Sequence, residues 1–549
     1  MGRNKSKRTM KRKLVMAASA LLFATNSFAG GYLTNTNQNA AFGRNLSQEA
    51  QIDITSTYAN PAGVGFLTPG WHFALNNQSA WQTRTAESWF VHPQQGPFAQ
   101  GYVNGLNNSA ATKEYKGTAT APIIPSFDLA YVHDRWSLAF HFGVVGGGGK
   151  CEFKNGLGSF ESKVAMLPSV LNAFAGTTAA AGYAMDTYMR GKQYYFGGQL
   201  NGSYKATDNL NIALGLRAVY ASSNYYGYVR DMKVVTPTGA QVPVRDAMAP
   251  LVTQLATAVP QLAPVMESIA GVAGDVNLNC DQKGWGITPI IGVDWRINDH
   301  WNLAAKYEFK TRMRLENESG ESASASALAQ LDEYADGKKV AADLPAILYL
   351  GAQYSPIKQV RINAGAHVFF DKQATQYNHR EKELQGQTWE LAAGAEYDIN
   401  KVVTVSAGWQ STNYGLGDNS KYISDMSFVC SSNSVGLGAR FHVSKHVALD
   451  VSYFKTLYKH YDRYQTDYNG IKQNFGTLLT QVGGSVAQIA QGIAAEDVAA
   501  GINPQDDPRM AVFNQLNSAV AGVSAVEVPG NDHLHRTNDV LGIGVIVNF

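Results

Sequence analysis

Three basic side chains stand at polar positions of segments that otherwise alternate with apolar residues: Arg217, Lys306 and Arg361. In an extended strand, such a side chain points to the face opposite its apolar neighbours. A guanidinium or ammonium group held in this way can bind the carboxylate of a ligand. Acidic side chains share the same phase, so ion pairs within the protein are the competing interpretation. These acids are Asp128, Glu308, Glu390, Glu396 and Asp450.

Other kinds of site chemistry have no support in the sequence. The stretch GGGGKC at 146–151 does not fit a phosphate-binding loop, because Val144 replaces the first glycine and Cys151 the final Ser or Thr. The three cysteines form no CxxC or Cys/His metal spacing, and whether Cys151 and Cys280 are bridged stays open. We therefore expect a protein that is not an enzyme and that uses no cofactor or metal.

The elements that would position these side chains are strands. Aromatic residues make up 11% of the 549 residues, 53 are glycine and only 16% are charged, a composition typical of strands that carry Tyr and Gly. Mean hydropathy is −0.20, and no run of about 18 apolar residues occurs, so helical membrane spans are excluded. Period-two alternation recurs, for example at 210–220, 301–310 and 360–370, and in a last strand at 538–549.

The connections between alternating segments fall into two classes. Six are short and polar, at 133–135, 207–209, 298–300, 356–358, 399–401 and 444–445. The others are long, at roughly 83–119, 150–191, 227–284, 315–343, 373–387, 412–432 and 457–536. Short turns on one side and long loops on the other are typical of outer-membrane barrels, whereas a soluble multi-sheet protein would not keep this order.

Six turns join twelve strands, and a first strand near 70–82 and the last strand bring the total to fourteen. The sequence therefore predicts an all-β fold, a 14-stranded antiparallel transmembrane β-barrel spanning 70–549, with long, partly helical extracellular loops. Closure removes the open strand edges that lipid cannot satisfy.

Two segments precede the barrel. Residues 1–29 are predicted to be a signal peptide rather than a membrane anchor, because seven basic residues precede a short apolar run that ends at Phe23. Ala29 is a small residue of the kind found at signal-peptidase cleavage sites. Their removal takes the formal charge from +2 to −5, so nothing indicates nucleic acid. Residues 30–69 alternate poorly but carry apolar residues such as Ile54 and Phe66, which favours a hatch that plugs the lumen over a disordered tail.

Two of the long loops are unusually apolar for segments that face water. Residues 164–189 and 248–274 can each form amphipathic helices broken by proline. We expect either a groove between them that captures an apolar ligand, or a lid in which the helices merely pack on each other. The candidate capture residues are Leu167, Leu171, Phe174, Met185, Leu251, Leu255, Leu262 and Met266.

Several motifs together resemble the FadL family of outer-membrane transporters of hydrophobic compounds. They are the start Gly30-Gly31-Tyr32, AFGRN at 41–45, ANPAG at 59–63, APIIPSFDLAYVHDRWSLAFHFG at 121–143 and ADLPAILYLGAQYSP at 342–356. The resemblance implies a 14-stranded barrel in the bacterial outer membrane with an N-terminal hatch. It assigns the hatch motif to Gly43, Arg44, Asn60, Pro61 and Ala62.

The resemblance also implies uptake of long-chain fatty acids or other apolar molecules, with lateral release through a kink in the third strand. The residues that fit this kink are Phe142, Gly143, Gly146, Gly147, Gly148 and Gly149, although the glycines could equally form a flexible hinge into the next loop. An aqueous porin and an adhesive barrel that displays its loops are the alternative functions. The expected partners are the apolar ligand, the bilayer with its lipopolysaccharide and, through the C-terminal Phe549, the barrel assembly machinery; we expect a monomer.

Overall fold

The computed structural model describes residues 34–90, 102–103, 106–107, 112–176, 179–265, 274–319, 332–418, 420–524 and 527–549. The predicted signal peptide, residues 1–29, lies outside this part of the chain. No helix within the described residues is both long and apolar enough to cross a bilayer.

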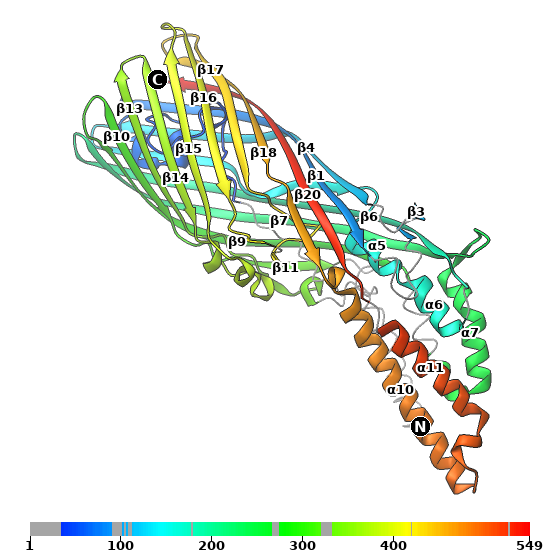
Figure 1. Cartoon of the computed structure of the whole chain (residues 1–549). Helices are drawn as coiled ribbons and strands as arrows, with labels where there is room; N and C mark the ends of the chain where they lie inside the picture. The colour runs from blue at the N-terminus through cyan, green and yellow to red at the C-terminus, as the bar shows by residue number, and fades with distance from the viewer. Residues whose placement is uncertain are drawn as a thin grey trace.

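Fourteen antiparallel strands close into a barrel, which confirms the predicted fold (Figure 1). Each strand pairs with the next, and the last returns to the first in continuous register from His72↔Asn548 to Phe90↔Gly530. In order around the wall the strands are β1 (Gly70–Phe90), β4 (Lys113–His133), β5 (Trp136–Phe153), β6 (Gly182–Thr207), β7 (Leu210–Val235), β9 (Val276–Arg296), β10 (Trp301–Glu308), β13 (Ile347–Ile357), β14 (Val360–Phe369), β15 (Thr388–Asp398), β16 (Val403–Asn413), β17 (Ser432–His442), β18 (Val447–Tyr458) and β20 (Gly530–Asn548).

Six short strands complete the β structure of the described residues. Four of them extend the wall where the long strands end: β8 (Gln241–Pro243), β11 (Arg314–Ser319), β12 (Lys339–Ala341) and β19 (Tyr461–Gln465). The other two, β2 (Tyr102–Val103) and β3 (Leu106–Asn107), pair with each other.

The period-two pattern explains the barrel wall. In β7, the outward-facing Leu214 and Leu216 are 66% and 53% exposed. The next residue, Arg217, points into the lumen and is 2% exposed. All six predicted short turns lie between consecutive strands at one end of the barrel. Exposed Trp136 and Trp301 lie beside these turns, as expected for aromatic side chains at a membrane interface.

Several strands run further than the sequence analysis predicts. β6 and β7 have 26 residues each, whereas about 10 suffice to span a bilayer. They continue into the predicted loops 150–191 and 227–284, where packing on the loop helices keeps them extended. Their inner face there packs on loop helices: Tyr183, Tyr225 and Val229 are buried in one apolar cluster with them.

The long loops fold into a helical arm at the end of the barrel away from the short turns and the C-terminus (Figure 1). Its α-helices are α5 (Gly158–Val164), α6 (Leu167–Ala175), α7 (Val244–Ala258), α10 (Ile471–Ala499) and α11 (Pro508–Ser524). The 3₁₀ helices η2 (Pro260–Leu262), η7 (Tyr468–Gly470) and η8 (Pro504–Asp506) join them, while η4 (Asp332–Tyr334), η5 (Asp371–Gln373) and η6 (Tyr377–Glu383) lie in other loops.

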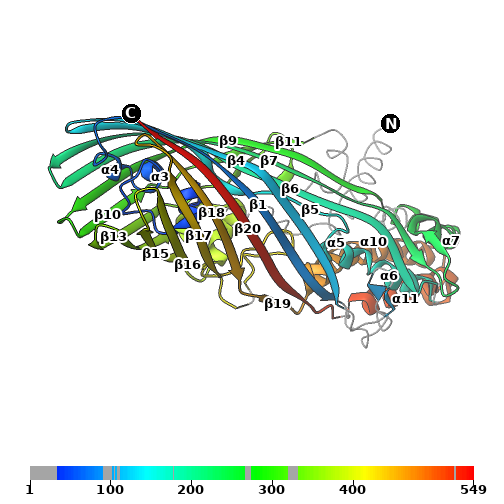
Figure 2. The ribbon, with the colours of Figure 1, turned by 90° about the horizontal axis from the view of Figure 1, so that it is seen from above.

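The described N-terminal residues fill the lumen. Three short helices, α2 (Ala40–Arg44), α3 (Ser56–Ala59) and α4 (Pro61–Val64), lie inside the ring of strands (Figure 2). Helix α2 contacts β16, β17, β18, β20 and β1, and α4 contacts β5, β6, β7 and β9. Nearly every side chain from 38 to 65 is buried, so the described residues before β1 plug the barrel, and we call residues 34–69 the hatch.

Candidate functional site

The barrel wall is interrupted between β4 and β5. Backbone pairing between these strands runs from His133↔Trp136 up to Phe127↔Phe142, stops, and resumes only at Thr118↔Glu152. Residues 119–126 of β4 and 143–151 of β5 are therefore not paired with each other. We call this opening the wall gap.

Prolines on β4 make the wall gap possible. Pro122 and Pro125 lack the N–H that a central strand needs, so each restricts its strand to an edge. Side chains of β1 satisfy part of the exposed backbone: Asn77 Oδ1 accepts from Ile124 N at 3.1 Å, and Ser79 Oγ donates to Pro122 O at 2.7 Å. The two prolines in APIIPSF are a signal in the sequence for an interruption of the wall at this strand.

The glycine run on β5 bends toward the lumen at the same height. Register shifts against β6 fall between Val144 and Gly146 and between Gly146 and Gly149. Gly147 and Gly149 have φ of 95° and 69°, which L residues rarely adopt. The bent segment pairs with the hatch through a Thr34↔Gly146 bridge.

Further hydrogen bonds join the hatch to the bent strand. Asn35 N donates to Val145 O at 2.9 Å, and the side chains of Asn35 and Gln38 donate to Val144 O at 2.9 and 3.1 Å. The hatch therefore supplies hydrogen-bond partners to residues 144–146, within the part of β5 that is not paired with β4. Both Phe142 and Gly143 lie at the lower end of the bend, where Phe142 still pairs with Phe127.

A cavity of about 390 Å³ runs from the hatch to the wall gap. Its lumen side is lined by Phe42 of the hatch, Phe454 of β18 and Val540 of β20. Its far side reaches Ile123 and Phe196, which belong to the outer face of the wall; Ile123 is 73% exposed. The lining of this cavity therefore includes both lumen-facing and outward-facing side chains.

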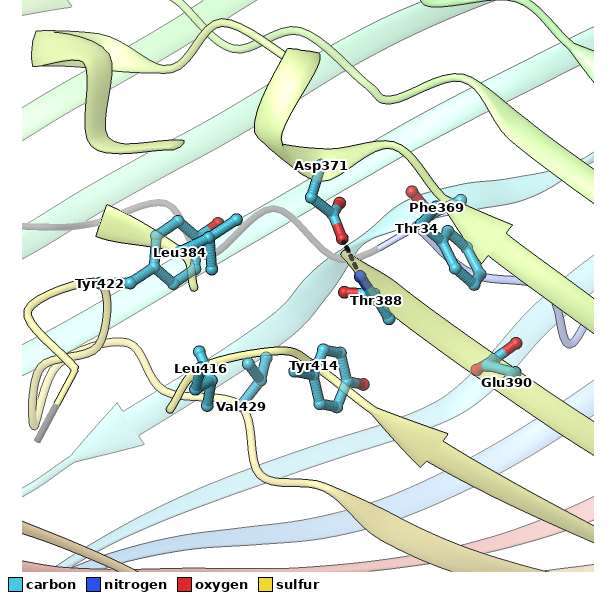
Figure 3. A pocket seen from close by; sticks show the side chains of 10 residues that line it. All are labelled: Thr34, Phe369, Asp371, Leu384, Thr388, Glu390, Tyr414, Leu416, Tyr422 and Val429. Atoms are coloured by element: carbon cyan, nitrogen blue, oxygen red, sulfur yellow. Dashed lines mark hydrogen bonds between the residues drawn. The ribbon is translucent and has the colours of Figure 1, made fainter. Parts of the chain in front are cut away.

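A smaller cavity of about 50 Å³ lies beside the larger one (Figure 3). The two share Thr34, Glu390 and Tyr414 in their linings. In Figure 3, Leu384 and Tyr422 face Leu416 across this space. The small cavity adds loop residues such as Asp371, Leu384 and Tyr422 to the space that the large cavity borders.

The hatch motif residues hold the hatch against the wall. Arg44 forms ion pairs with Glu396 and, at 3.3 Å, with Asp450. A Cβ on Gly43 would meet Ser452 of β18, so this position requires close approach. Pro61 is the first residue of α4, behind the N-cap Asn60. Asn60 Nδ2 donates to Asp294 of β9 at 3.2 Å. The carbonyl of Ala62 accepts a hydrogen bond from Asn211 Nδ2 of β7 at 2.5 Å.

The three predicted ligand cations are instead paired with carboxylates of the protein. Arg217 donates twice to Glu308 at 2.7 Å, and Lys306 donates to Glu308 and to the hatch carbonyl of Tyr58, both at 2.7 Å. Arg361 binds Glu396 and Asp398 near the short turns. None of the three lines the large cavity; Arg217 and Lys306 contact Tyr58 of the hatch, and Arg361 joins side chains of the wall.

Two arginines that the sequence analysis missed do line the cavity. Arg84 of β1 and Arg536 of β20 are direct partners across the strand pair, and their side chains are 8% and 7% exposed. Both fall inside segments predicted as loops, 83–119 and 457–536, because the strands extend beyond their predicted ends. The alternation that continues from Ala80 through Gln82 to Arg84 is the signal that could have revealed them.

The predicted capture residues form a closed core rather than an open groove. Leu171, Phe174 and Leu255 are 3%, 1% and 3% exposed, and they pack with α10 and α11 in one cluster. This is the lid arrangement, because each helix buries its apolar face on its neighbours. Leu167, Leu251 and Leu262 belong to the same cluster, Met185 packs against it, and Met266 lies outside the described residues.

Among the described residues, the cysteines and the acidic groups form no metal or disulfide site. Cys151, Cys280 and Cys430 are buried free thiols, so the Cys151–Cys280 bridge is not formed. In the part of the chain that the structure describes, no cluster of three or more His, Cys, Asp or Glu side chains is arranged to hold a metal ion.

Solved structures share this architecture at low sequence identity. A FadL homologue of Pseudomonas aeruginosa matches with a TM-score of 0.55 and 13% identity, over 95% of this chain and 100% of that one. The toluene transporter TodX of P. putida gives 0.48 and 13%, over 90% and 94%, and the toluene transporter TbuX of Ralstonia pickettii gives 0.47 and 13%, over 93% and 98%. The search of curated sequences finds no match.

A sequence profile supplies the family. The profile described as outer membrane protein transport protein (OMPP1/FadL/TodX) matches residues 170–491, which is more than half of the chain. This family consists of transport channels and not of enzymes. The closed 14-stranded barrel, the hatch and the profile agree, and the chain belongs to the OMPP1/FadL/TodX family of outer-membrane transport proteins.

Proposed function

We propose that this protein takes up long-chain fatty acids or other hydrophobic molecules, holds them in the 390 Å³ cavity and releases them sideways through the wall gap. The observation that carries the proposal is the cavity lining, which includes both hatch residues and the outward-facing Ile123 and Phe196. The ligand would enter from the arm side and leave into the outer half of the membrane.

The physical argument is the cost of returning an apolar chain to water. Each CH₂ group buried contributes about 0.8 kcal/mol, so about 15 methylenes favour an apolar site by roughly 12 kcal/mol. In a water-filled pore through the hatch, the chain would be exposed to water again and would lose this stabilisation. A sideways exit keeps the chain in apolar surroundings from the cavity to the bilayer.

Capture by the arm requires the helices to part, because their apolar faces are closed on one another. We propose that a ligand replaces helix–helix contacts among Leu171, Phe174 and Leu255 and is then passed to the cavity. Adaptable Met side chains such as Met166 and Met248 in the same cluster suit such repacking.

We also propose that residues 1–29 direct export and are removed, and that Phe549 is read by the barrel assembly machinery. Phe549 is 73% exposed at the end of the barrel that carries the short turns. The outward aromatic and apolar side chains would contact lipid and lipopolysaccharide in the outer membrane, with the protein as a monomer.

An uptake assay tests the function. The chain is expressed in an outer membrane that lacks other channels for such compounds, and entry of a radiolabelled long-chain fatty acid and of toluene is followed. We expect uptake of at least one compound by the intact chain, and loss of uptake without residues 34–69 while the barrel still folds. Unchanged uptake without the hatch, or a steady ion conductance of the intact protein in planar bilayers, would contradict the proposal and favour an aqueous porin.

Mass spectrometry of lipid extracts from the purified protein gives an independent answer. A transporter with this cavity should retain an apolar compound through purification. Absence of any such compound, together with absence of uptake, would favour a barrel that only displays its loops.

A further inference from the structure

We propose that Arg84 and Arg536 form a binding site for the anionic head group of an amphiphilic ligand, at one end of the large cavity. The inference rests on the proposed uptake function and narrows its substrate class to molecules that join a carboxylate to an apolar chain. Neither residue belongs to the three cations that the sequence indicated, and neither takes part in holding the hatch.

The two guanidinium groups lie close together in a buried position. Arg84 and Arg536 are directly opposite each other on β1 and β20, so their Cβ atoms are about 5 Å apart and both side chains point into the lumen. Like charges that face each other across a strand pair destabilise the pair. At 8% and 7% exposure, water compensates little of this repulsion.

Neither guanidinium has a carboxylate partner among the described residues. Arg84 donates one bond, to Gly148 O at 3.2 Å, and Arg536 donates one, to Phe428 O at 3.3 Å, while its guanidinium lies over the Tyr458 ring. The Nε of each arginine is buried without a hydrogen-bond partner. An arginine has five N–H donors, so most donors of this pair are left for a ligand.

The lumen shows what a paired arginine looks like, and the contrast is informative. Arg217 and Arg440 each donate two bonds to one carboxylate, Glu308 and Asp450 respectively. Among the described residues that line the cavity around Arg84 and Arg536, Glu390 is the one carboxylate, and it is bound by His367 and Thr412. The protein therefore leaves two buried positive charges uncompensated at a cavity, which is the arrangement that an anion would stabilise.

The rest of the cavity fits a chain attached to that anion. Four residues below the arginines on the same strands are Ala80 and Val540, which is about 13 Å lower along an extended strand. There they form an apolar cluster with Phe42 and Phe454. A carboxylate on the arginines thus places its chain beside the hatch and level with the wall gap, where Ala80 pairs with Ala121.

The pair also contacts the bent strand directly. Arg84 donates to Gly148, which lies in the glycine run that borders the wall gap. A carboxylate that draws the Arg84 guanidinium toward Arg536 competes with this bond. The site therefore connects recognition of the head group with the segment through which the chain would leave.

The test compares a charged ligand with its neutral analogue on the purified full-length protein in detergent. Binding of hexadecanoate and of hexadecanol is measured for the intact chain, for Arg84→Gln, for Arg536→Gln and for the double variant. Each charge-assisted pair lost should weaken hexadecanoate binding about tenfold to a hundredfold, while hexadecanol binding changes less than about twofold. Lys455→Gln is the matched control, because Lys455 points to the outer face and is paired with Asp539.

The possible outcomes separate the two proposals. Equal weakening of both ligands, or no weakening of either, overturns the anion site but leaves uptake of apolar compounds standing. No binding of either ligand by the intact chain overturns both. Competition by inorganic phosphate as effective as that by hexadecanoate would also overturn the amphiphile, because it would assign the pair to free anions.

Folding of the variants does not confound the result. Removing one of two buried, unpaired like charges should leave the barrel as stable as before or more stable, which heat-induced unfolding measures. Arg84→Lys should restore part of the hexadecanoate preference, since it keeps the charge. A preference that stays lost in Arg84→Lys while Arg84→Gln unfolds early would contradict the assignment and indicate a structural role.

Discussion

The bend in β5 predicts a specific effect of adding one methyl group at Gly147. This residue has φ of 95°, and a Cβ built on it would overlap the backbone carbonyl of Gln193 on β6. A non-glycine residue at such a φ costs about 1–3 kcal/mol. Gly147→Ala should therefore disfavour the bent strand relative to a straight one by about fivefold to 150-fold, and the overlap adds to this.

Two further glycine variants separate the causes. Gly149→Ala carries the cost of a positive φ, 69°, but its Cβ meets nothing within 4 Å, so a smaller effect is expected. Gly202→Ala on β6 has only an ordinary contact with Leu138 at 3.8 Å and should behave like the unchanged protein. Uptake of a radiolabelled fatty acid should be highest for Gly202→Ala, lower for Gly149→Ala and lowest for Gly147→Ala.

The barrel itself should be unaffected, because β5 still pairs with β4 below Phe142 and with β6 along most of its length. Heat-modified migration on gels checks this. Full uptake by a folded Gly147→Ala variant would refute the reasoning that links the bend to release.

Three other predictions concern the hatch and the arm. Arg44→Ala breaks the buried ion pairs with Glu396 and Asp450 and should loosen the hatch by about 3–5 kcal/mol, seen as faster hydrogen exchange at residues 34–69 with unchanged strand protection; equal exchange would contradict it. Phe174→Ala should destabilise the arm by about 3–5 kcal/mol in thermal melts followed by circular dichroism, whereas Val498→Ala, at a 65% exposed site, should change it by less than about 0.5 kcal/mol. Burial lowers the pKa of Lys163 in α5 to about 7, against the opposing attraction of Asp425. In the unfolded state this lysine keeps its proton up to about pH 10, so the unfolded state binds more protons between about pH 7 and about pH 10. The stability of the helix should therefore rise with pH over this range and be constant below it. Lys163→Met should remove this slope.

The strand pattern could be predicted from the sequence because lipid contact imposes it. Outward positions such as Leu214 and Leu216 must be apolar and inward ones such as Arg217 need not be, so period two is visible in every hairpin. The strand ends could not be predicted in the same way. Above the membrane, both faces of β6 and β7 carry mixed residues, and it is packing on the arm that keeps these strands extended.

The candidate site was predicted in part. The glycine run was found because glycine at a strand position is unusual, and its bend matches the wall gap. The carboxylate partners decide which arginine is available, and partners are contributed by distant strands. Arg217 is neutralised by Glu308, 91 residues away, whereas Arg84 faces Arg536 across a strand pair that joins the two ends of the barrel sequence. Nothing local in the sequence distinguishes the two situations.

The central claim, release through the wall gap, can be tested by following where a ligand travels. A fatty acid with a photoreactive diazirine near its chain end is presented from the arm side to the protein in membranes, and adducts are mapped by mass spectrometry. The account predicts adducts at Phe42 or Phe454 in the cavity and at Ile123 on the lip of the gap, well above those at Ile287, an equally lipid-facing residue on β9 that is 59% exposed. The excess at Ile123 should disappear in Gly147→Ala while cavity adducts remain. Equal labelling of Ile123 and Ile287 in the intact protein, or adducts that continue below the hatch toward Arg361, would contradict it.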